Sequence, residues 1–82
     1  MRRPMVAGNW KMHGTCASVA ELAEGLRDLA LSDQIDVAVF PSGLHIGQVV
    51  AGLQDVRIQV GAQDCAVEPM PGALTGEISA SQ

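Results

Sequence analysis

The sequence predicts an α/β fold in which short parallel strands alternate with helices. Three short runs rich in apolar and β-branched residues, at 5–10, 35–40 and 56–62, are separated by two segments with helical periodicity. Strands that alternate with helices usually pair in parallel through right-handed crossovers. The order strand, helix, strand, helix, strand and then loop does not by itself separate an open doubly wound sheet from a barrel.

The first strand is expected to be buried over residues 5–10, and Gly14-Thr15 ends it. The spacing of Ser18 and Glu21 matches a capping box at the start of the following helix, although that helix could equally begin nearer Thr15. This helix is expected to end at Ser32-Asp33. Its apolar residues recur at steps of three and four and form one stripe, namely Val19, Leu22, Ala23, Leu26, Leu29 and Ala30.

The second strand is β-branched and stops at Pro41-Ser42-Gly43. Residues 44–53 predict a weaker helix, because Gly47 and Gly52 each cost about 1 kcal/mol relative to alanine. After the third strand, residues 64–76 carry two prolines and two glycines. This composition predicts a loop longer than most strand-to-helix connections.

Composition excludes several classes of partner. The 82 residues are 48% hydrophobic and 17% charged, with a net charge of −4, so nucleic acid and anionic membranes are not expected partners. No apolar run reaches the roughly 18 residues of a membrane span, and no signal peptide is expected. Cys16 and Cys65 are too few for a disulfide framework, which favours reduced thiols in the cytoplasm. No cluster has zinc-ligand spacing, and no metal or cofactor is expected.

The stretch Gly8-Asn9-Trp10-Lys11-Met12 closes the first apolar run. On a continuous strand, Asn9 and Lys11 would project from the same face, because side chains alternate with period two. Ligands of parallel α/β proteins bind beyond the carboxyl ends of the strands. An amide and an ammonium placed there would suit an anionic ligand. The alternative is a solvated lysine whose stem lies on apolar surface.

Three motifs carry a resemblance to a known family. Val6-Ala-Gly-Asn-Trp-Lys-Met12, followed by Gly14-Thr15, resembles the N-terminal signature of the triosephosphate isomerases. Residues 60–64 resemble that family's third strand and its exit, and residues 72–79 resemble its third loop and the start of the next helix, in the same order. The resemblance covers all 82 residues but only about the first third of a (β/α)₈ barrel of ~250 residues. It implies a single partial domain over 1–82, a parallel β-α-β-α-β segment of a TIM barrel that is incomplete in this chain.

The resemblance also implies a function. The family interconverts dihydroxyacetone phosphate and glyceraldehyde 3-phosphate, an aldose–ketose isomerisation of glycolysis and gluconeogenesis, through an enediolate and without a cofactor. It implies a cytoplasmic homodimer that binds a small triose phosphate. By this resemblance Lys11 and Asn9 are catalytic and bind substrate, and Trp10 lines the same site. Gln63 lies near the base of the site and does not itself contact the substrate. The dimer loop contains Thr75, Gly76 and Glu77, and Thr75 reaches the partner's active site.

The family's base and electrophilic histidine are expected beyond residue 82, so the 82-residue chain is expected to be inactive alone. Histidine is a common acid–base group, but His13 and His45 both lack the context of that histidine, and His45 is expected on the solvated side of its helix. One alternative is a small non-catalytic α/β module that associates through the loop at 67–76. Another is a flavodoxin-like fragment that holds a phosphate at its first turn, where residues 12–15 supply one glycine and one hydroxyl.

Overall fold

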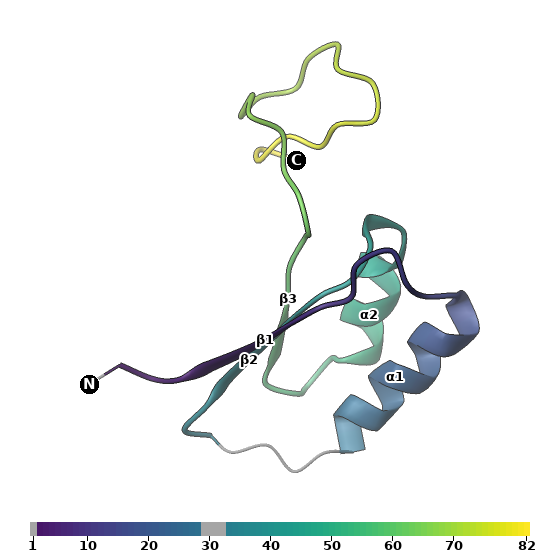
Figure 1. Ribbon diagram of the computed structural model, residues 1–82, viewed down its shortest axis with the longest axis vertical. Helices are drawn as coiled ribbons and strands as arrows, with labels where there is room; N and C mark the ends of the chain where they lie inside the picture. The colour runs from purple at the N-terminus through teal and green to yellow at the C-terminus, as the bar shows by residue number, and fades with distance from the viewer. Residues whose placement is uncertain (1, 29–32) are drawn as a thin grey trace.

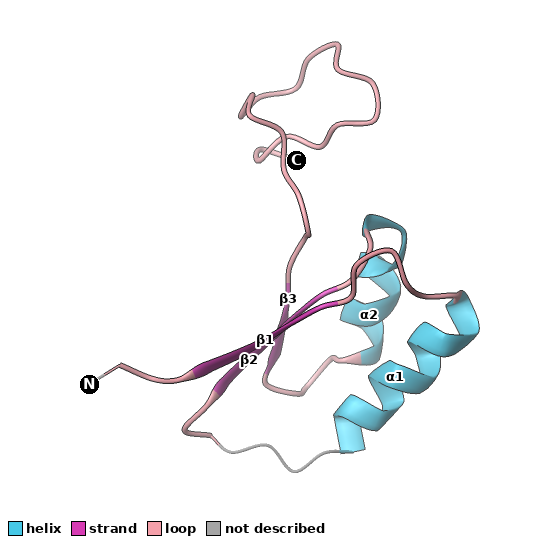
Figure 2. Cartoon of the chain, viewed as in Figure 1, coloured by secondary structure: helices cyan, strands magenta, loops and turns pink. Residues whose placement is uncertain are grey.

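Three parallel strands form one open sheet in the computed structural model, which describes residues 2–28 and 33–82 (Figure 1). The strands are β1 (Met5–Asn9), β2 (Asp36–Phe40) and β3 (Ile58–Val60). The helices are α1 (Cys16–Asp28) and α2 (Ile46–Gly52), and the 3₁₀ turn η1 (Gly43–His45) leads into α2. Both helices lie on one side of the sheet (Figure 2), as successive right-handed crossovers require. The predicted α/β class with parallel strands is confirmed.

The strands are ordered β1-β2-β3, with Ala7 opposite Ala38 and Val39 opposite Val60. In a flavodoxin-like sheet the first strand lies between the second and the third. The observed order therefore excludes the flavodoxin-like alternative. It agrees with a barrel segment, in which neighbouring strands follow one another along the chain.

The core lies between the two helices and the strands β2 and β3. Its buried apolar side chains come from α1, β2, α2 and the start of β3, namely Val19, Ala23, Val39, Val49, Leu53 and Ile58. Trp10 and Leu26 are partly buried and pack against this cluster. Leu22 was expected in the same stripe of α1, but its exposed fraction is 48%. Leu29, Ala30 and Ser32 lie outside the described residues.

The prediction that the first strand is buried is wrong. Met5 and Val6 are 57% and 59% exposed, and β1 contributes no residue to the core cluster. Edge position alone is not the reason, since β1 and β3 are both edge strands; the core cluster gathers over β2 and β3 and leaves β1 outside it. An apolar sequence allows a strand to be buried, but the elements that pack against the strand determine whether it is.

The start of α1 differs from the predicted Ser18–Glu21 capping box. The Thr15 hydroxyl accepts a hydrogen bond from the Ser18 N–H at 3.1 Å, and the Ser18 hydroxyl accepts one from the Thr15 N–H at 2.8 Å. The first main-chain helical bond runs from the Val19 N–H to the Thr15 carbonyl at 2.9 Å. Thr15 is therefore the N-cap residue, which agrees with the alternative prediction that the helix begins nearer Thr15. Ser18, three residues after this N-cap residue, occupies the position that glutamate usually holds in a capping box.

The other elements are shorter than predicted. The first strand ends at Asn9 rather than Trp10, and β3 occupies three residues of the expected seven at 56–62. The predicted helix at 44–53 begins with the η1 turn, and α2 starts at Ile46. No described helix is long and apolar enough to cross a membrane.

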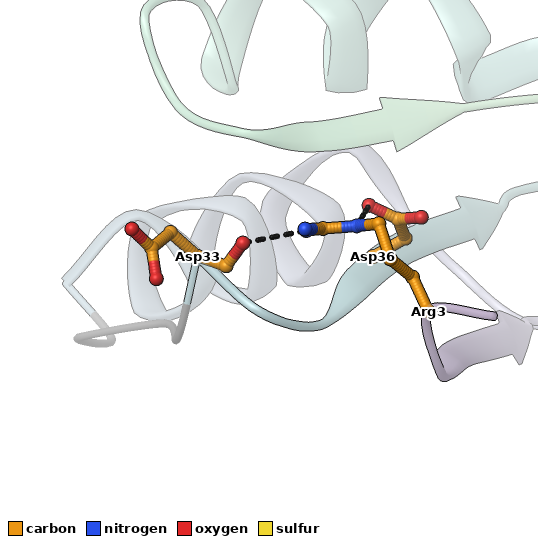
Figure 3. A network of polar contacts seen from close by, with 3 residues as sticks. All are labelled: Arg3, Asp33 and Asp36. Atoms are coloured by element: carbon orange, nitrogen blue, oxygen red, sulfur yellow. Dashed lines mark hydrogen bonds and ion pairs between the residues drawn. The ribbon is translucent and has the colours of Figure 1, made fainter. Parts of the chain in front are cut away.

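An arginine joins the amino-terminal ends of β1 and β2 (Figure 3). The Arg3 Nε atom lies 3.1 Å from Asp36 Oδ1, and its Nη2 atom donates to the Asp33 carbonyl at 2.5 Å. The Arg3 and Asp36 side chains are 46% and 39% exposed, so the ion pair contributes at most about 1 kcal/mol. It lies at the end of the sheet opposite the polar residues that follow β1.

The segment 64–82 forms a loop that stands apart from the sheet and helices (Figure 1). Its two ends are tied by a hydrogen bond from the Ala66 N–H to the Ile78 carbonyl at 2.8 Å, and another joins the Ser81 N–H to the Pro69 carbonyl at 3.0 Å. No regular helix or strand is present within it. The predicted loop at 64–76 is confirmed and extends further along the chain.

Candidate functional site

Lys11 lies in a tight turn beyond the end of β1. Its φ angle is 56°, in the left-handed region that lysine seldom adopts. The Asn9 side-chain oxygen accepts a hydrogen bond from the Lys11 N–H at 2.8 Å, and the His13 N–H donates to the Trp10 carbonyl at 3.2 Å. The prediction that Asn9 and Lys11 project from one strand face is therefore wrong. The strand ends between them, and the chain turns at the lysine.

Gln63 holds the other side of this turn. Its Nε2 atom donates to the Lys11 carbonyl at 2.9 Å and to the Phe40 carbonyl at 2.8 Å. Phe40 ends β2, and Gln63 follows β3. One amide thus joins the chain beyond all three strands at the carboxyl-terminal edge of the sheet. Gln63 was expected near the base of the site. Its hydrogen bond with Lys11 is to the main-chain carbonyl and not to the ammonium.

Asn9 and Lys11 nevertheless line the same hollow, of about 350 Å³, between the turn and the start of α1. The rest of its lining is Trp10, His13, Gly14, Ser18, Val19 and Leu22. No carboxylate is among these residues, and within the described chain the Lys11 ammonium has no ion-pair partner. The hollow can hold an anion and place a positive charge beside one of its oxygens. Its described lining supplies no carboxylate that could remove a proton from carbon.

Trp10 combines packing with a place in this lining. Its side chain packs against the core cluster, and its main-chain N–H donates to the Phe40 carbonyl at 3.1 Å, which extends the β1–β2 ladder by one bond. The wall of the hollow at this point is continuous with the core.

The two histidines have surroundings that the sequence did not indicate. His13 lines the hollow beside Lys11. His45 was expected in solvent, and that prediction is wrong: 9% of it is exposed, and its Nε2 atom lies 3.3 Å from the Gly14 carbonyl. A regular helix over 44–53 would have placed it outward. The η1 turn at this point has a different period and turns the ring inward.

The residues expected in the dimer loop lie away from this hollow. Thr75, Gly76 and Glu77 are exposed in the 64–82 loop, and none of them lines the hollow beside Lys11. Gly76 has a φ of 84°, and Glu77 lines a separate hollow of about 510 Å³ inside the loop. Their role at a subunit interface stays a prediction.

The described residues contain no group of three or more His, Cys, Asp or Glu side chains that could hold a metal ion. Cys16 and Cys65 are free and exposed. The side chains lining the hollow beside Lys11 supply an ammonium, an amide, an imidazole and a hydroxyl, from Lys11, Asn9, His13 and Ser18.

Comparisons with known proteins agree with the sequence motifs. The triosephosphate isomerase family model matches residues 4–82. Curated triosephosphate isomerases from Pseudomonas fluorescens strains Pf-5 and Pf0-1 are 71% and 70% identical to the chain, and one from Ectopseudomonas mendocina is 66% identical. Each match covers 100% of this chain and 33% of the relative, so the chain spans about a third of the length of the curated relatives it matches.

Proposed function

Because the chain belongs to the triosephosphate isomerase family, we propose that it supplies the Lys11 and Asn9 part of a site that interconverts dihydroxyacetone phosphate and glyceraldehyde 3-phosphate. In this reaction a proton leaves the carbon next to a carbonyl, and negative charge develops on the carbonyl oxygen of the resulting enediolate. The Lys11 ammonium attracts the phosphorylated substrate and stabilises that oxygen. The Asn9 NH₂ group is a further donor toward the substrate.

One observation carries this proposal: two side-chain amides hold the Lys11 main chain from both sides. Asn9 accepts from its N–H at 2.8 Å, and Gln63 donates to its carbonyl at 2.9 Å. A left-handed lysine costs about 1–3 kcal/mol and persists when its surroundings over-determine it, which is common at functional sites. A held main chain restricts where the Lys11 ammonium can lie before the substrate arrives, and charge placed in advance needs less reorganisation during the reaction, which is the basis of electrostatic catalysis.

The proposal assigns the proton-abstracting group to another part of the enzyme. None of the described residues lining the hollow beside Lys11 is a carboxylate. We therefore expect the 82-residue polypeptide to show no isomerase turnover by itself, since loss of a general base typically costs 10²–10⁴-fold in rate.

The proposed assembly is a cytoplasmic homodimer. The loop at 64–82 stands clear of the sheet and carries exposed Thr75 and Leu74, so it is accessible to a second subunit. Thr75 is proposed to contact the partner's active site. The alternative, a non-catalytic module that associates through the same loop, has no observation of its own to favour it.

The test uses a joined enzyme, in which residues 1–82 are followed by the two thirds of the Pseudomonas fluorescens Pf-5 relative that the chain does not cover. We expect this enzyme to interconvert the two triose phosphates. Lys11→Met should lower kcat/KM by about 10²–10³-fold, on the scale of losing one oxyanion donor. Both amide bonds go to the Lys11 main chain, so the substitution removes the charge and leaves the turn in place.

The control is the apparent thermal midpoint, which Lys11→Met should leave unchanged. Lys11→Arg keeps the positive charge on a planar group and should retain more activity than the methionine variant. An inactive joined enzyme with native circular dichroism would contradict the proposed function. Full activity of Lys11→Met would contradict the role of the lysine.

A further inference from the structure

We propose that His45 is a positioning residue for Lys11, which it holds in place through the carbonyl of Gly14. The inference rests on the proposed function of Lys11. His45 belongs to the η1 turn after β2, whereas Lys11 and Gly14 belong to the connection between β1 and α1. The histidine therefore links two neighbouring connections at the carboxyl-terminal edge of the sheet.

The Nε2 atom of His45 lies 3.3 Å from the Gly14 carbonyl oxygen. A carbonyl oxygen only accepts hydrogen bonds, so a hydrogen bond between these two atoms requires the tautomer that carries its proton on Nε2. The ring is buried, with 9% of the residue exposed, so this donor has little access to water as a substitute. A buried group that forms a specific bond to a carbonyl restrains the main chain that carries it.

The fit of the ring against Gly14 depends on the absence of a side chain there. Gly14 has a φ of 129°, a conformation suited to glycine alone. A Cβ atom at this position would lie 3.3 Å from His45 Cδ2 and 3.0 Å from Val19 Cγ2. The close approach of the His45 ring to the main chain therefore requires the glycine conformation at position 14. The core residue Val19 also leaves no room for a side chain there.

This bond completes the restraint of the Lys11 connection. Asn9 and Gln63 hold the chain at Lys11, and the Thr15 cap holds it where α1 begins. Between these points, the described contacts of the segment 12–14 are the bond from the His13 N–H to the Trp10 carbonyl and the His45 ring. Loss of the ring would free the segment three residues from the lysine. A displacement of about 1 Å in a catalytic group can cost up to 10²-fold in rate.

The test compares His45→Gln with His45→Asn in the joined enzyme. Glutamine places an N–H donor near the position of the histidine Nε2 atom, whereas asparagine is polar but too short to reach it. We expect His45→Gln to keep kcat/KM within about threefold of the parent and His45→Asn to lose about tenfold. The apparent thermal midpoints of the two variants should agree within about 2 °C, so that the difference in rate is not a difference in stability.

Equal kcat/KM values for the two variants would overturn the proposal. So would a loss in His45→Asn matched by a lower thermal midpoint. If either variant fails to fold, ¹⁵N spectra of the histidine-labelled parent decide: a protonated Nε2 at His45 supports the inference, and an unprotonated Nε2 overturns it. Failure of the proposed function is recognised separately: the joined parent enzyme would then be inactive despite native circular dichroism, and failure of the lysine's role would show as full activity of Lys11→Met whatever the His45 variants do.

Discussion

The side-chain amide of Gln63 donates a hydrogen bond to the main-chain carbonyl of Lys11 at 2.9 Å, across 52 positions of sequence. The same nitrogen donates to the Phe40 carbonyl at 2.8 Å. An NH₂ group has two N–H bonds, so both of its donors are used. One side chain that follows β3 therefore donates to a carbonyl group beyond β1 and to one at the end of β2, and the Phe40 carbonyl also accepts a hydrogen bond from the Trp10 main-chain N–H.

Gln63→Glu tests this dependence with a substitution of nearly the same shape. A carboxylate only accepts hydrogen bonds, so the glutamate side chain would have no hydrogen to donate to the Lys11 and Phe40 carbonyl oxygens. In the joined enzyme we expect a loss of about 1 kcal/mol or more in stability, which corresponds to about 2–4 °C in thermal midpoint for a protein of 150–250 residues. We also expect kcat/KM to fall about tenfold, because the Lys11 turn loses one of its two amide partners.

Gln54→Glu is the matched control. Gln54 is an exposed residue of the turn after α2, and the substitution makes the same change of charge. We expect it to leave kcat/KM within about twofold and stability within about 0.5 kcal/mol. Equal effects at positions 54 and 63 would show that the added charge matters and the two hydrogen bonds do not.

The sequence predicted which residues gather at the site better than it predicted how they do so. Asn9, Lys11 and Gln63 were identified from their places after strands and from the family motifs. The Lys11 turn was missed because a left-handed lysine has no sequence signal, unlike a glycine or an asparagine. The bonds of Gln63 were missed because they depend on two chain segments distant in sequence.

The same distinction applies to the elements. The alternation of strands and helices follows from local pattern, and it was predicted correctly. The exposure of β1 and the burial of His45 were not predicted. The exposure of β1 depends on which strands become neighbours, and the burial of His45 depends on a single 3₁₀ turn before α2. Both depend on contacts between elements, and the apolar periodicity of a ten-residue window carries no information about those contacts.

Gly14→Ala should destabilise the joined enzyme. Its φ of 129° is strained for any residue with a side chain, and the new Cβ would lie 3.0 Å from Val19 Cγ2. We expect a loss of about 1–3 kcal/mol, measured as the change in thermal midpoint. Gly25→Ala in α1 is the control, because nothing lies within 4 Å of its Cβ position, and there the change should stabilise the helix by about 0.5–1 kcal/mol. Destabilisation of similar size at both positions would contradict this account of Gly14.

Gly61→Ala should force Phe40 out of its present position. The added Cβ would lie 2.6 Å from Phe40 Cε1, well inside contact distance. We expect a loss of about 1–3 kcal/mol from overpacking. Phe40→Leu removes the ring atoms concerned, so Gly61→Ala should cost less in the Phe40→Leu background, by about 0.5 kcal/mol or more in a double-mutant cycle of thermal midpoints. Strict additivity of the two substitutions would show that the ring and the glycine are not coupled.

The start of α1 gives a prediction that separates two capping arrangements. The bonds between Thr15 and Ser18, at 2.8 and 3.1 Å, predict that Thr15→Ala lowers stability by about 1 kcal/mol, whereas Thr15→Ser keeps the hydroxyl and most of the stability. Ser18→Ala removes the acceptor for the Thr15 N–H and should also be destabilising. Glu21 would matter only if Ser18 were the N-cap residue, so Glu21→Ala should change stability by no more than about 0.5 kcal/mol. Thermal midpoints of the four variants decide between the arrangements: a cost at Glu21 equal to that at Thr15 would make Ser18 the N-cap residue, with the helix beginning at Val19 and three residues shorter than the observed α1.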